Sequence, residues 1–370
     1  MLSTYPPKLC GLATFAAALG SALNRAGERV TVIDIDDTGL HDGASRARHQ
    51  LVNGSPASVR ETARVLSQCD IAIVQHEYGI YGGVDGDEII DVLRALSVPA
   101  IVILHTVPAR PSAHQKVVLE MVCDIAAHVV VMTNAAGTRL TAGYDVDSSK
   151  VVMIPHGASL AIAGGRDLPD DDRPQLLTWG LLGPGKGIEH AIRAVSLLGD
   201  LRPRVDYTVA GATHPKVFAR DGDRYRQSLI LEAQKYGIAS SIRFDDTYRD
   251  VPTLMRFVAS ASLVVLPYDS RDQVTSGVLV DAIAAGRPVI ATAFPHAVEL
   301  LSNGAGIVVP HDDPVALAGA IRAVVSDPAR LEAMAARASA IAPSLSWEAV
   351  AARYRDVCEA LAPVGAAVSV

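Results

Sequence analysis

The sequence alternates between short apolar runs and longer segments with helical periodicity. In its first half the apolar runs occupy residues 29–35, 69–77, 99–106, 128–133 and 151–157. They are almost unbroken stretches of valine and isoleucine, whereas a strand with one face in water alternates apolar and polar residues. Segments with helical spacing lie between them, including 13–26 and 115–127. The pattern predicts parallel strands with helices on both faces, which is a doubly wound α/β fold.

The alternation stops at residues 160–173, where glycine, proline and acidic residues cluster as in a linker. It starts again with apolar runs at 174–180, 205–211, 241–246, 261–268, 287–292 and 305–310. A chain of 370 residues has room for two domains. We therefore predict a Rossmann-like domain at 1–160, a linker at 161–173, a second Rossmann-like domain at 174–342 and a helical segment at 343–370. Ligands in such sheets bind at the carboxyl ends of the strands, so residues just after the strands are the site candidates.

Composition narrows the class of protein. The net charge is -7, with acids and bases interspersed, which argues against a nucleic-acid partner. The four cysteines are scattered, so neither a disulfide framework nor a cysteine metal site is expected. No apolar run has the length of a membrane span and no signal peptide is evident, so we expect a cytoplasmic protein, with peripheral membrane contact left open. The start, MLSTYPP, gives the first strand so few residues that either this strand is short or the chain begins further upstream.

In the first half, candidate residues follow the apolar runs. Gly11 opens a helix after a Tyr-Pro-Pro turn, where backbone amides can face an anion, although a plain tight turn is the alternative. Glu77 and Tyr78 precede a glycine-rich loop and can contact a hydroxylated substrate, with Glu77 orienting an acceptor hydroxyl or acting as a base. His105 and His156 each follow an apolar run and can bind sugar hydroxyls, or they can be structural histidines. The acids of DIDD, at 34–37, are expected to be exposed residues rather than metal ligands.

In the second half, TWGLLGPGKGIEHAI predicts a strand, a Gly/Pro loop and a helix with Lys186 in its first turn. A cation is unfavourable beside the positive end of a helix dipole, but it becomes favourable if a diphosphate binds there. His214, in the turn GATHP after the next strand, is a further candidate for the same site.

The segment QVTSGVLVDAIAAG, at 273–286, predicts a polar loop that enters a helix. Thr275, Ser276 and Gly277 stand at the helix start, where they can cap the helix or leave its amides free for phosphate oxygens. Asp281 lies one turn further on and can accept both hydroxyls of a ribose, or it can be a solvent-facing acid. Gln273 offers an amide for a sugar hydroxyl.

Together these motifs resemble glycosyltransferase family four, the retaining nucleotide-sugar enzymes with the GT-B fold. The resemblance runs along nearly the whole chain and is most specific in VLVDAIAAGRPVIAT and the following VELLSNGAGIVVPHDDPVALAGAI. It implies two Rossmann-like domains facing each other across a cleft. The second domain would bind the donor, the first would supply most of the acceptor site, and the last helix would pack back on the first domain.

The resemblance also implies transfer of a hexosyl group with retention at the anomeric carbon, without a metal or another cofactor. His105, Lys186 and Gln273 would serve catalysis. The donor would contact Gly11, Gly180, Lys186, Gln273, Thr275, Ser276, Gly277, Val278 and Asp281. The sugar or acceptor would contact Glu77, Tyr78, His105, His156 and His214.

Three motifs depart from the family pattern. Gln273 and Asp281 stand in place of two glutamates, Leu181 replaces an arginine and Cys10 replaces a glycine. A protein that binds nucleotide sugars without transferring them is therefore the main alternative, and a sugar phosphorylase or epimerase on the same architecture is another. GDP-mannose and UDP-glucose both suit the donor site, and the acceptor can be a lipid, a saccharide or a small glycoside.

Overall fold

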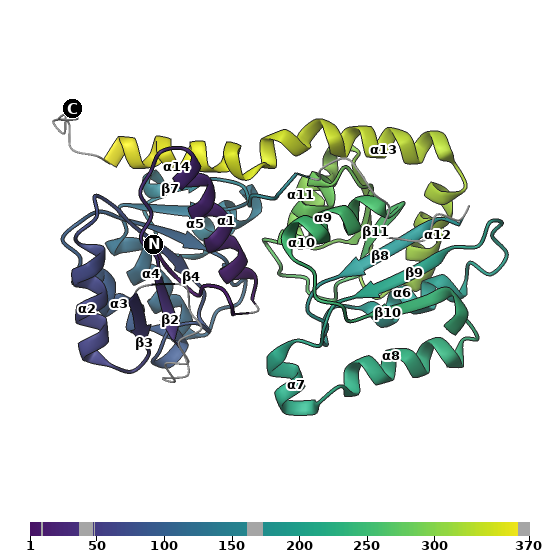
Figure 1. Ribbon diagram of the computed structural model, residues 1–370, viewed down its shortest axis with the longest axis horizontal. Helices are drawn as coiled ribbons and strands as arrows, with labels where there is room; N and C mark the ends of the chain where they lie inside the picture. Colours follow the sequence, from purple (N-terminus) through teal and green to yellow (C-terminus); the bar gives the residue numbers. More distant parts are fainter. Residues whose placement is uncertain (9, 37–46, 48, 161–172, 362–370) are drawn as a thin grey trace. The chain divides into compact units, whose positions relative to one another are not determined.

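The chain divides into two α/β units (Figure 1). The computed structural model describes residues 1–8, 10–36, 47, 49–160 and 173–361. The first unit comprises Met1–Gly157 together with the chain from Trp347 onward, and the second comprises Ala158–Ser346. Most of the predicted linker, and Asp37 of the DIDD motif, lie outside the described residues.

The first unit contains a seven-stranded parallel sheet in the order β3-β2-β1-β4-β5-β6-β7. Its strands are β1 (Leu2–Ser3), β2 (Ile33–Asp36), β3 (His49–Val52), β4 (Ala72–His76), β5 (Ala100–Leu104), β6 (His128–Val131) and β7 (Val151–Met153). The five predicted strands of this half are confirmed as β2, β4, β5, β6 and β7. The first strand has only two residues, yet it lies between β2 and β4 near the middle of the sheet.

The helical elements of the first unit are α1 (Gly11–Arg25), α2 (Pro56–Leu66), η1 (Val84–Gly86), α3 (Glu88–Arg94), α4 (Ala113–Ile125), α5 (Asn134–Gly143), η2 (Ser148–Lys150) and α14 (Trp347–Leu361). Helix α14 runs along α1 although more than 300 residues separate them in sequence (Figure 1). Trp347, Val350 and Tyr354 of α14 join the core that contains Phe15 and Leu19 of α1. The last helix is thus an integral part of the first unit.

The second unit contains a six-stranded parallel sheet in the order β10-β9-β8-β11-β12-β13. Its strands are β8 (Gln175–Trp179), β9 (Asp206–Ala210), β10 (Ile242–Asp245), β11 (Leu263–Leu266), β12 (Val289–Thr292) and β13 (Gly306–Val309). The helical elements are α6 (Ile188–Ser196), α7 (Pro215–Asp221), α8 (Arg224–Lys235), η3 (Ala239–Ser241), α9 (Val251–Ser260), α10 (Gly277–Ala284), α11 (Pro295–Leu300), η4 (Leu301–Asn303), α12 (Pro314–Val325), α13 (Pro328–Ile341) and η5 (Ala342–Leu345). All six predicted strands are confirmed.

The central strands of the second unit, β8, β11 and β12, are buried on both faces. Leu177, Val264 and Ala291 pack in one hydrophobic cluster. Their neighbours along the same strands, including Leu176 and Ile290, pack in another. Because successive side chains of a strand point to opposite faces, these clusters form one core layer on each side of the sheet. The unbroken apolar runs of the sequence are thereby explained.

The strand order reverses once in each sheet, between β1 and β4 in the first unit and between β8 and β11 in the second. Open α/β sheets bind ligands outside the carboxyl ends of the strands at this reversal point. The segments that follow β1, β4, β8 and β11 carry most of the candidate residues. Within the described residues, no helix is both long enough and apolar enough to cross a membrane.

Candidate functional site

In the first unit, Cys10 caps the helix that follows β1. Its Sγ accepts a hydrogen bond from the Ala13 amide at 3.4 Å, and Gly11 is the first helical residue. A side chain at Gly11 would meet no atom within 4 Å. The first amides of a helix have no intrahelical acceptor, so the amide of Gly11 remains a candidate donor to a phosphate oxygen.

At the end of β5, the side chain of Gln75 holds His105. The distance between Gln75 Oε1 and His105 Nε2 is 2.7 Å. With the amide in this orientation, Nε2 carries the proton and Nδ1 remains an acceptor. Burial lowers the pKa of His105 to about 3, with smaller contributions from His156 and His76. His105 is therefore a neutral hydrogen-bonding group and not a cationic acid. The sequence reasoning missed Gln75, whose only signal was a polar residue inside an apolar strand.

His156 lies in an aromatic cluster. Its ring centroid is 5.0 Å from that of Phe15 and 5.7 Å from that of Trp347, and its Nδ1 lies 2.7 Å from the carbonyl oxygen of Gly157. Phe15 also contacts the ring of His105 at 5.1 Å. Burial lowers the pKa of His156 to about 4. The structure thus brings His105 and His156 into contact with the same ring, that of Phe15.

Glu77 and Tyr78 have local partners after β4. Thr106 donates a hydrogen bond to the Glu77 carboxylate, which also accepts one from the Tyr78 amide at 3.1 Å. The Tyr78 hydroxyl donates to the Gln115 carbonyl at 3.2 Å. His76 precedes them as the last residue of β4 and is fully buried, in agreement with the apolar run at 69–77.

In the second unit, Lys186 lies in the loop between β8 and α6. It precedes the helix, whose N-cap is Gly187, so the predicted position in the first helical turn was wrong. Its Nζ lies 4.4 Å from the ring centroid of Tyr268, which follows β11. Burial lowers the pKa of Lys186, and no carboxylate of the described residues forms an ion pair with it. The loop therefore presents a partly buried ammonium supported by an aromatic face.

Gly187 fixes the close approach of this loop to the segment after β11. It has a φ of 61°, and a Cβ there would lie 1.8 Å from the carbonyl oxygen of Pro267. Gly185, two residues earlier, also has a positive φ of 89°, but a Cβ there meets nothing within 4 Å. Both glycines need a positive φ, but only Gly187 also lies too close to a neighbouring segment to carry a side chain.

We expect Gly187→Ala to destabilise the protein more than Gly185→Ala. Both changes place a side chain at positive φ, which costs about 1–2 kcal/mol. Only Gly187→Ala also forces apart two packed backbone segments, adding about 1–3 kcal/mol. Thermal unfolding of the two variants measures the difference, and equal losses in midpoint would contradict the close approach.

At the start of α10, Ser276 and His296 organise the backbone. Ser276 Oγ accepts from the Leu279 amide at 3.2 Å, which caps the helix. The Ser276 amide donates to Nδ1 of His296 at 2.8 Å. The Ser276 amide is therefore already used, which leaves those of Gly277 and Val278 as the available donors. His296, which caps this loop from α11, had no signal in the sequence.

Gln273 and Asp281 flank these amides. Gln273 Nε2 donates to the Thr275 carbonyl at 3.0 Å, and the Thr275 hydroxyl is buried without a hydrogen-bond partner among the described residues. Asp281 lies in the second turn of α10 and is partly buried. Burial raises its pKa to about 7. This helix start therefore combines free amides, an acid and an amide group within one short segment.

Comparison with protein families places these features in context. Residues 166–340 match the family described as "Glycosyl transferases group 1" and residues 10–161 match "Glycosyltransferase Family 4". The two matches together include both units and nearly all candidate residues.

The chain belongs to glycosyltransferase family 4. It is 29% identical over 257 residues to a D-inositol 3-phosphate glycosyltransferase of Nocardioides sp., a match that covers 64% of this chain and 54% of the relative. It is also 29% identical over 269 residues to the protein of the same name from Thermobispora bispora, covering 67% of this chain and 60% of the relative. The matched part of the chain thus spans a little over half the length of these relatives.

Solved structures show that this family member has the GT-B fold. The HepE protein of Anabaena in complex with UDP superimposes with a TM-score of 0.76 at 18% identity, covering 97% of this chain and 99% of that one. Sucrose-phosphate synthase from Thermosynechococcus elongatus gives the same TM-score at 20% identity, with coverage of 97% and 98%.

Other candidate residues of this glycosyltransferase-family chain have structural partners. Nδ1 of His214 accepts from the Lys216 amide at 3.2 Å and caps α7. Asp34 of the DIDD motif is buried and pairs with Lys8 at 3.2 Å. Gly180 follows β8, and its amide donates to the Ala210 carbonyl at 3.0 Å. The pair between Lys8 and Asp34 gives a structural role to an acid that was expected to be exposed.

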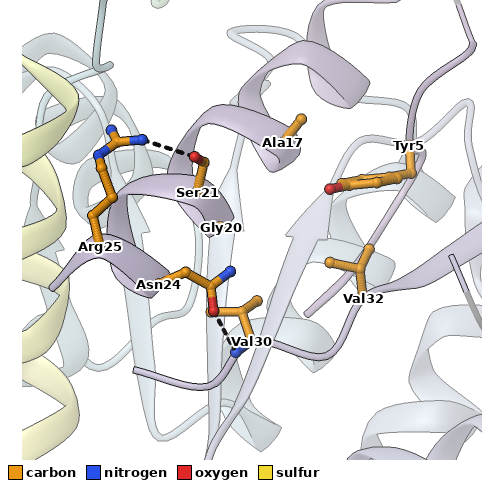
Figure 2. A pocket seen from close by; sticks show the side chains of 8 residues that line it. All are labelled: Tyr5, Ala17, Gly20, Ser21, Asn24, Arg25, Val30 and Val32. Carbon is orange, nitrogen blue, oxygen red and sulfur yellow. Dashed lines mark hydrogen bonds between the residues drawn. The ribbon is translucent and has the colours of Figure 1, made fainter. Parts of the chain in front are cut away.

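A surface pocket of the first unit lies apart from these residues (Figure 2). It is lined by Tyr5, Ala17, Gly20, Ser21, Asn24, Arg25, Val30 and Val32. Arg25 donates to Ser21 at 2.8 Å, and the Val30 amide donates to Asn24 at 3.2 Å, so its polar groups already pair with each other. None of the predicted site residues lines this pocket.

Proposed function

We propose that the protein transfers a hexosyl group from a nucleoside diphosphate sugar to an acceptor hydroxyl, with retention of the anomeric configuration and without a metal in the reaction. The observation that carries this proposal is Lys186, a partly buried ammonium with no carboxylate partner among the described residues. An unpaired buried cation is costly unless an anion binds beside it. A diphosphate supplies that anion.

The second unit offers further groups that suit such a donor. The amides of Gly277 and Val278 suit phosphate oxygens, because they lie at the positive end of the α10 dipole. Asp281 has a raised pKa and no cationic partner among the described residues, so its carboxyl group is available to a ribose. We assign Gln273 to the sugar, to which its amide can offer both a donor and an acceptor.

We assign recognition of the sugar and acceptor hydroxyls to the first unit. Neutral His105 can accept a hydrogen bond from a hydroxyl at Nδ1, because its Nε2 donates to Gln75. Glu77 is less suited to the role of a free base, since its carboxylate already holds Thr106 and the Tyr78 amide. Tyr78, His156 and His214 remain proposed contacts.

In the proposed mechanism the acceptor attacks the anomeric carbon from the side of the departing diphosphate. The leaving phosphate oxygen takes the acceptor proton, so the reaction needs no protein nucleophile and no cofactor. Lys186 and the two amides would stabilise the charge that develops on that oxygen. Gln273 carries no charge to stabilise the sugar cation, which predicts slower turnover than a carboxylate at this position would allow.

The names of similar proteins guide the choice of substrates. Structures of HepE hold UDP and UDP-glucose, and the relatives are named D-inositol 3-phosphate glycosyltransferases. We propose a uridine or guanosine diphosphate hexose as donor. Inositol 3-phosphate and simple glycosides are the first acceptors to test.

The decisive experiment incubates the protein with UDP-glucose or GDP-mannose and each acceptor in the presence of a chelator. We expect release of the nucleoside diphosphate and a product whose anomeric proton has the same configuration as the donor. Inversion at that carbon would contradict the proposed mechanism. Tight donor binding, seen as a raised unfolding midpoint, without any release of nucleotide would favour the binding-protein alternative.

A further inference from the structure

A second polar cluster in the second unit is not used by the proposed transfer reaction. It consists of His190 in the first turn of α6, Asp269 after β11 and Asp312 after β13. Nε2 of His190 lies 3.3 Å from Oδ1 of Asp269 and 3.4 Å from Oδ1 of Asp312. No two of the three ligand atoms are more than 4.8 Å apart.

These distances suit a shared cation better than direct hydrogen bonds. A charge-assisted hydrogen bond from an imidazolium to a carboxylate is about 2.7–2.9 Å long. Adjacent ligands of a divalent ion with bonds of about 2.1 Å lie about 3.0–3.4 Å apart in octahedral or tetrahedral geometry. Both measured separations fall at the upper end of that range and outside the hydrogen-bond range.

One buried atom of the cluster also lacks a hydrogen bond. Oδ1 of Asp269 is buried and has no hydrogen-bond partner among the described residues. A buried carboxylate oxygen without a donor is costly, and a missing ion or water is its usual explanation. The missing hydrogen-bond partner is a separate observation from the short distances between the ligand atoms.

The backbone around Asp312 places its carboxylate toward the cluster. Asp312 has a φ of 56°, a conformation that few non-glycine residues adopt. Its Oδ2 accepts from Arg271 at 3.0 Å while Oδ1 is the atom near His190. The preceding His311 is anchored to the Tyr268 carbonyl at 2.9 Å. The loop is thus held in a form that brings one oxygen of Asp312 to the other two groups.

We propose that His190, Asp269 and Asp312 bind one divalent transition-metal ion of the Mn²⁺ or Zn²⁺ class. One imidazole and two carboxylates are a mixed donor set, which such ions accept more readily than Mg²⁺ does. The side chain of Asp312 is 56% exposed, so water can complete the coordination on that side. The ion would be structural and would not touch the reacting atoms.

The ion would hold together the loop that carries Lys186. The Asp269 amide donates to the Gly185 carbonyl at 3.0 Å, and Asp269 directly follows Tyr268, whose ring lies beside Lys186 Nζ. An ion that joins α6 to the segments after β11 and β13 would therefore stabilise this loop. The proposal does not depend on the transfer reaction.

The test measures Mn²⁺ binding to the full-length protein after treatment with a chelator and without any nucleotide sugar. Electron paramagnetic resonance counts bound Mn²⁺, and thermal unfolding measures its effect on stability. We expect one bound ion per chain, a saturable rise of the unfolding midpoint by several degrees, competition by Zn²⁺ and little effect of equimolar Mg²⁺.

Three variants make the assignment specific. Asp312→Asn keeps a side chain that tolerates positive φ, and His190→Gln removes the imidazole. Each is expected to weaken Mn²⁺ binding at least tenfold. Asp200→Asn is the matched control, because Asp200 is another carboxylate of this unit paired with an arginine, at 2.7 Å from Arg322, and has no histidine beside it.

Two results would overturn the proposal. One is the absence of saturable Mn²⁺ binding by the wild-type protein. The other is equal binding by the wild-type protein and Asp312→Asn. Neither result bears on donor turnover, which is measured separately in the presence of a chelator.

Discussion

Replacing Lys186 with methionine is expected to lower kcat/KM for glycosyl transfer about 10²–10³-fold, the usual loss when one preorganised group that stabilises a developing oxyanion is removed. The methionine keeps an apolar stem against Tyr268, and it removes an ammonium whose burial lowers its own pKa. The unfolding midpoint is therefore expected to stay the same or to rise slightly. Steady-state kinetics and thermal unfolding of the same preparation measure both effects.

The matched control is Lys216→Met, which removes an exposed lysine from the first turn of α7 in the same unit. It is expected to leave kcat/KM unchanged. Wild-type turnover in the Lys186→Met variant would contradict the assignment of Lys186 to the diphosphate. A loss of turnover together with a large loss of stability would instead assign Lys186 a structural role.

The second large effect is a loss of stability of the first unit as the pH falls below 6.5. His76 is fully buried, neither ring nitrogen has a hydrogen-bond partner among the described residues, and burial lowers its pKa to about 4. Between pH 6.5 and pH 4 the unfolded chain therefore binds more protons than the folded one. The free energy of unfolding falls across this window by about 2 kcal/mol at pH 5 and about 3 kcal/mol at pH 4 from His76 alone.

His105 and His156 also lower the stability of the first unit as the pH falls, because burial lowers their pKa values to about 3 and 4. Asp281 acts in the opposite direction in the second unit. Its pKa is raised to about 7, so the folded chain binds the extra proton between pH 7 and pH 3.8 and that unit gains stability as the pH falls. The two units are thus expected to respond oppositely through these groups.

The two tryptophans allow the first unit to be followed separately. Trp347 is in the first unit and Trp179 is in β8 of the second, so Trp179→Phe leaves Trp347 as the reporter. Denaturant titrations between pH 8 and pH 4 then measure the unfolding of the first unit. His76→Leu in this background is expected to remove about 2 kcal/mol of the decline at pH 5. An equal decline with and without His76 would contradict the prediction.

The sequence predicted the fold well because the central strands of both sheets are buried on both faces. Continuous apolar runs leave little ambiguity, and all eleven predicted strands are present. It missed β3, where HQLV contains only two apolar residues at the edge of the sheet. It also began the helix after β8 too early, with Lys186 in its first turn, because helical spacing of apolar residues does not reveal that Gly187 caps the helix from a left-handed conformation.

The site was less predictable because its supporting contacts join residues far apart in the chain. Gln75 holds His105 from 30 residues away, and His296 holds the Ser276 amide from 20 residues away. No local pattern encodes such pairs. The residues that do follow a local rule, such as Gly11 and Ser276 at helix starts, were the ones that the sequence identified.

The position of α14 has a consequence for synthesis on the ribosome. Trp347 packs over Gly157, where any Cβ would lie 2.3 Å from the indole, and it contacts Phe15 at 5.0 Å. The core of the first unit therefore lacks one side until α14, which follows the second unit in the sequence, has left the exit tunnel. The second unit, which is contiguous in sequence, can complete its two core layers earlier. The first unit, whose translation begins first, is thus the last to have all of its core residues. The apolar face of α1 stays uncovered by α14 while the second unit is synthesised.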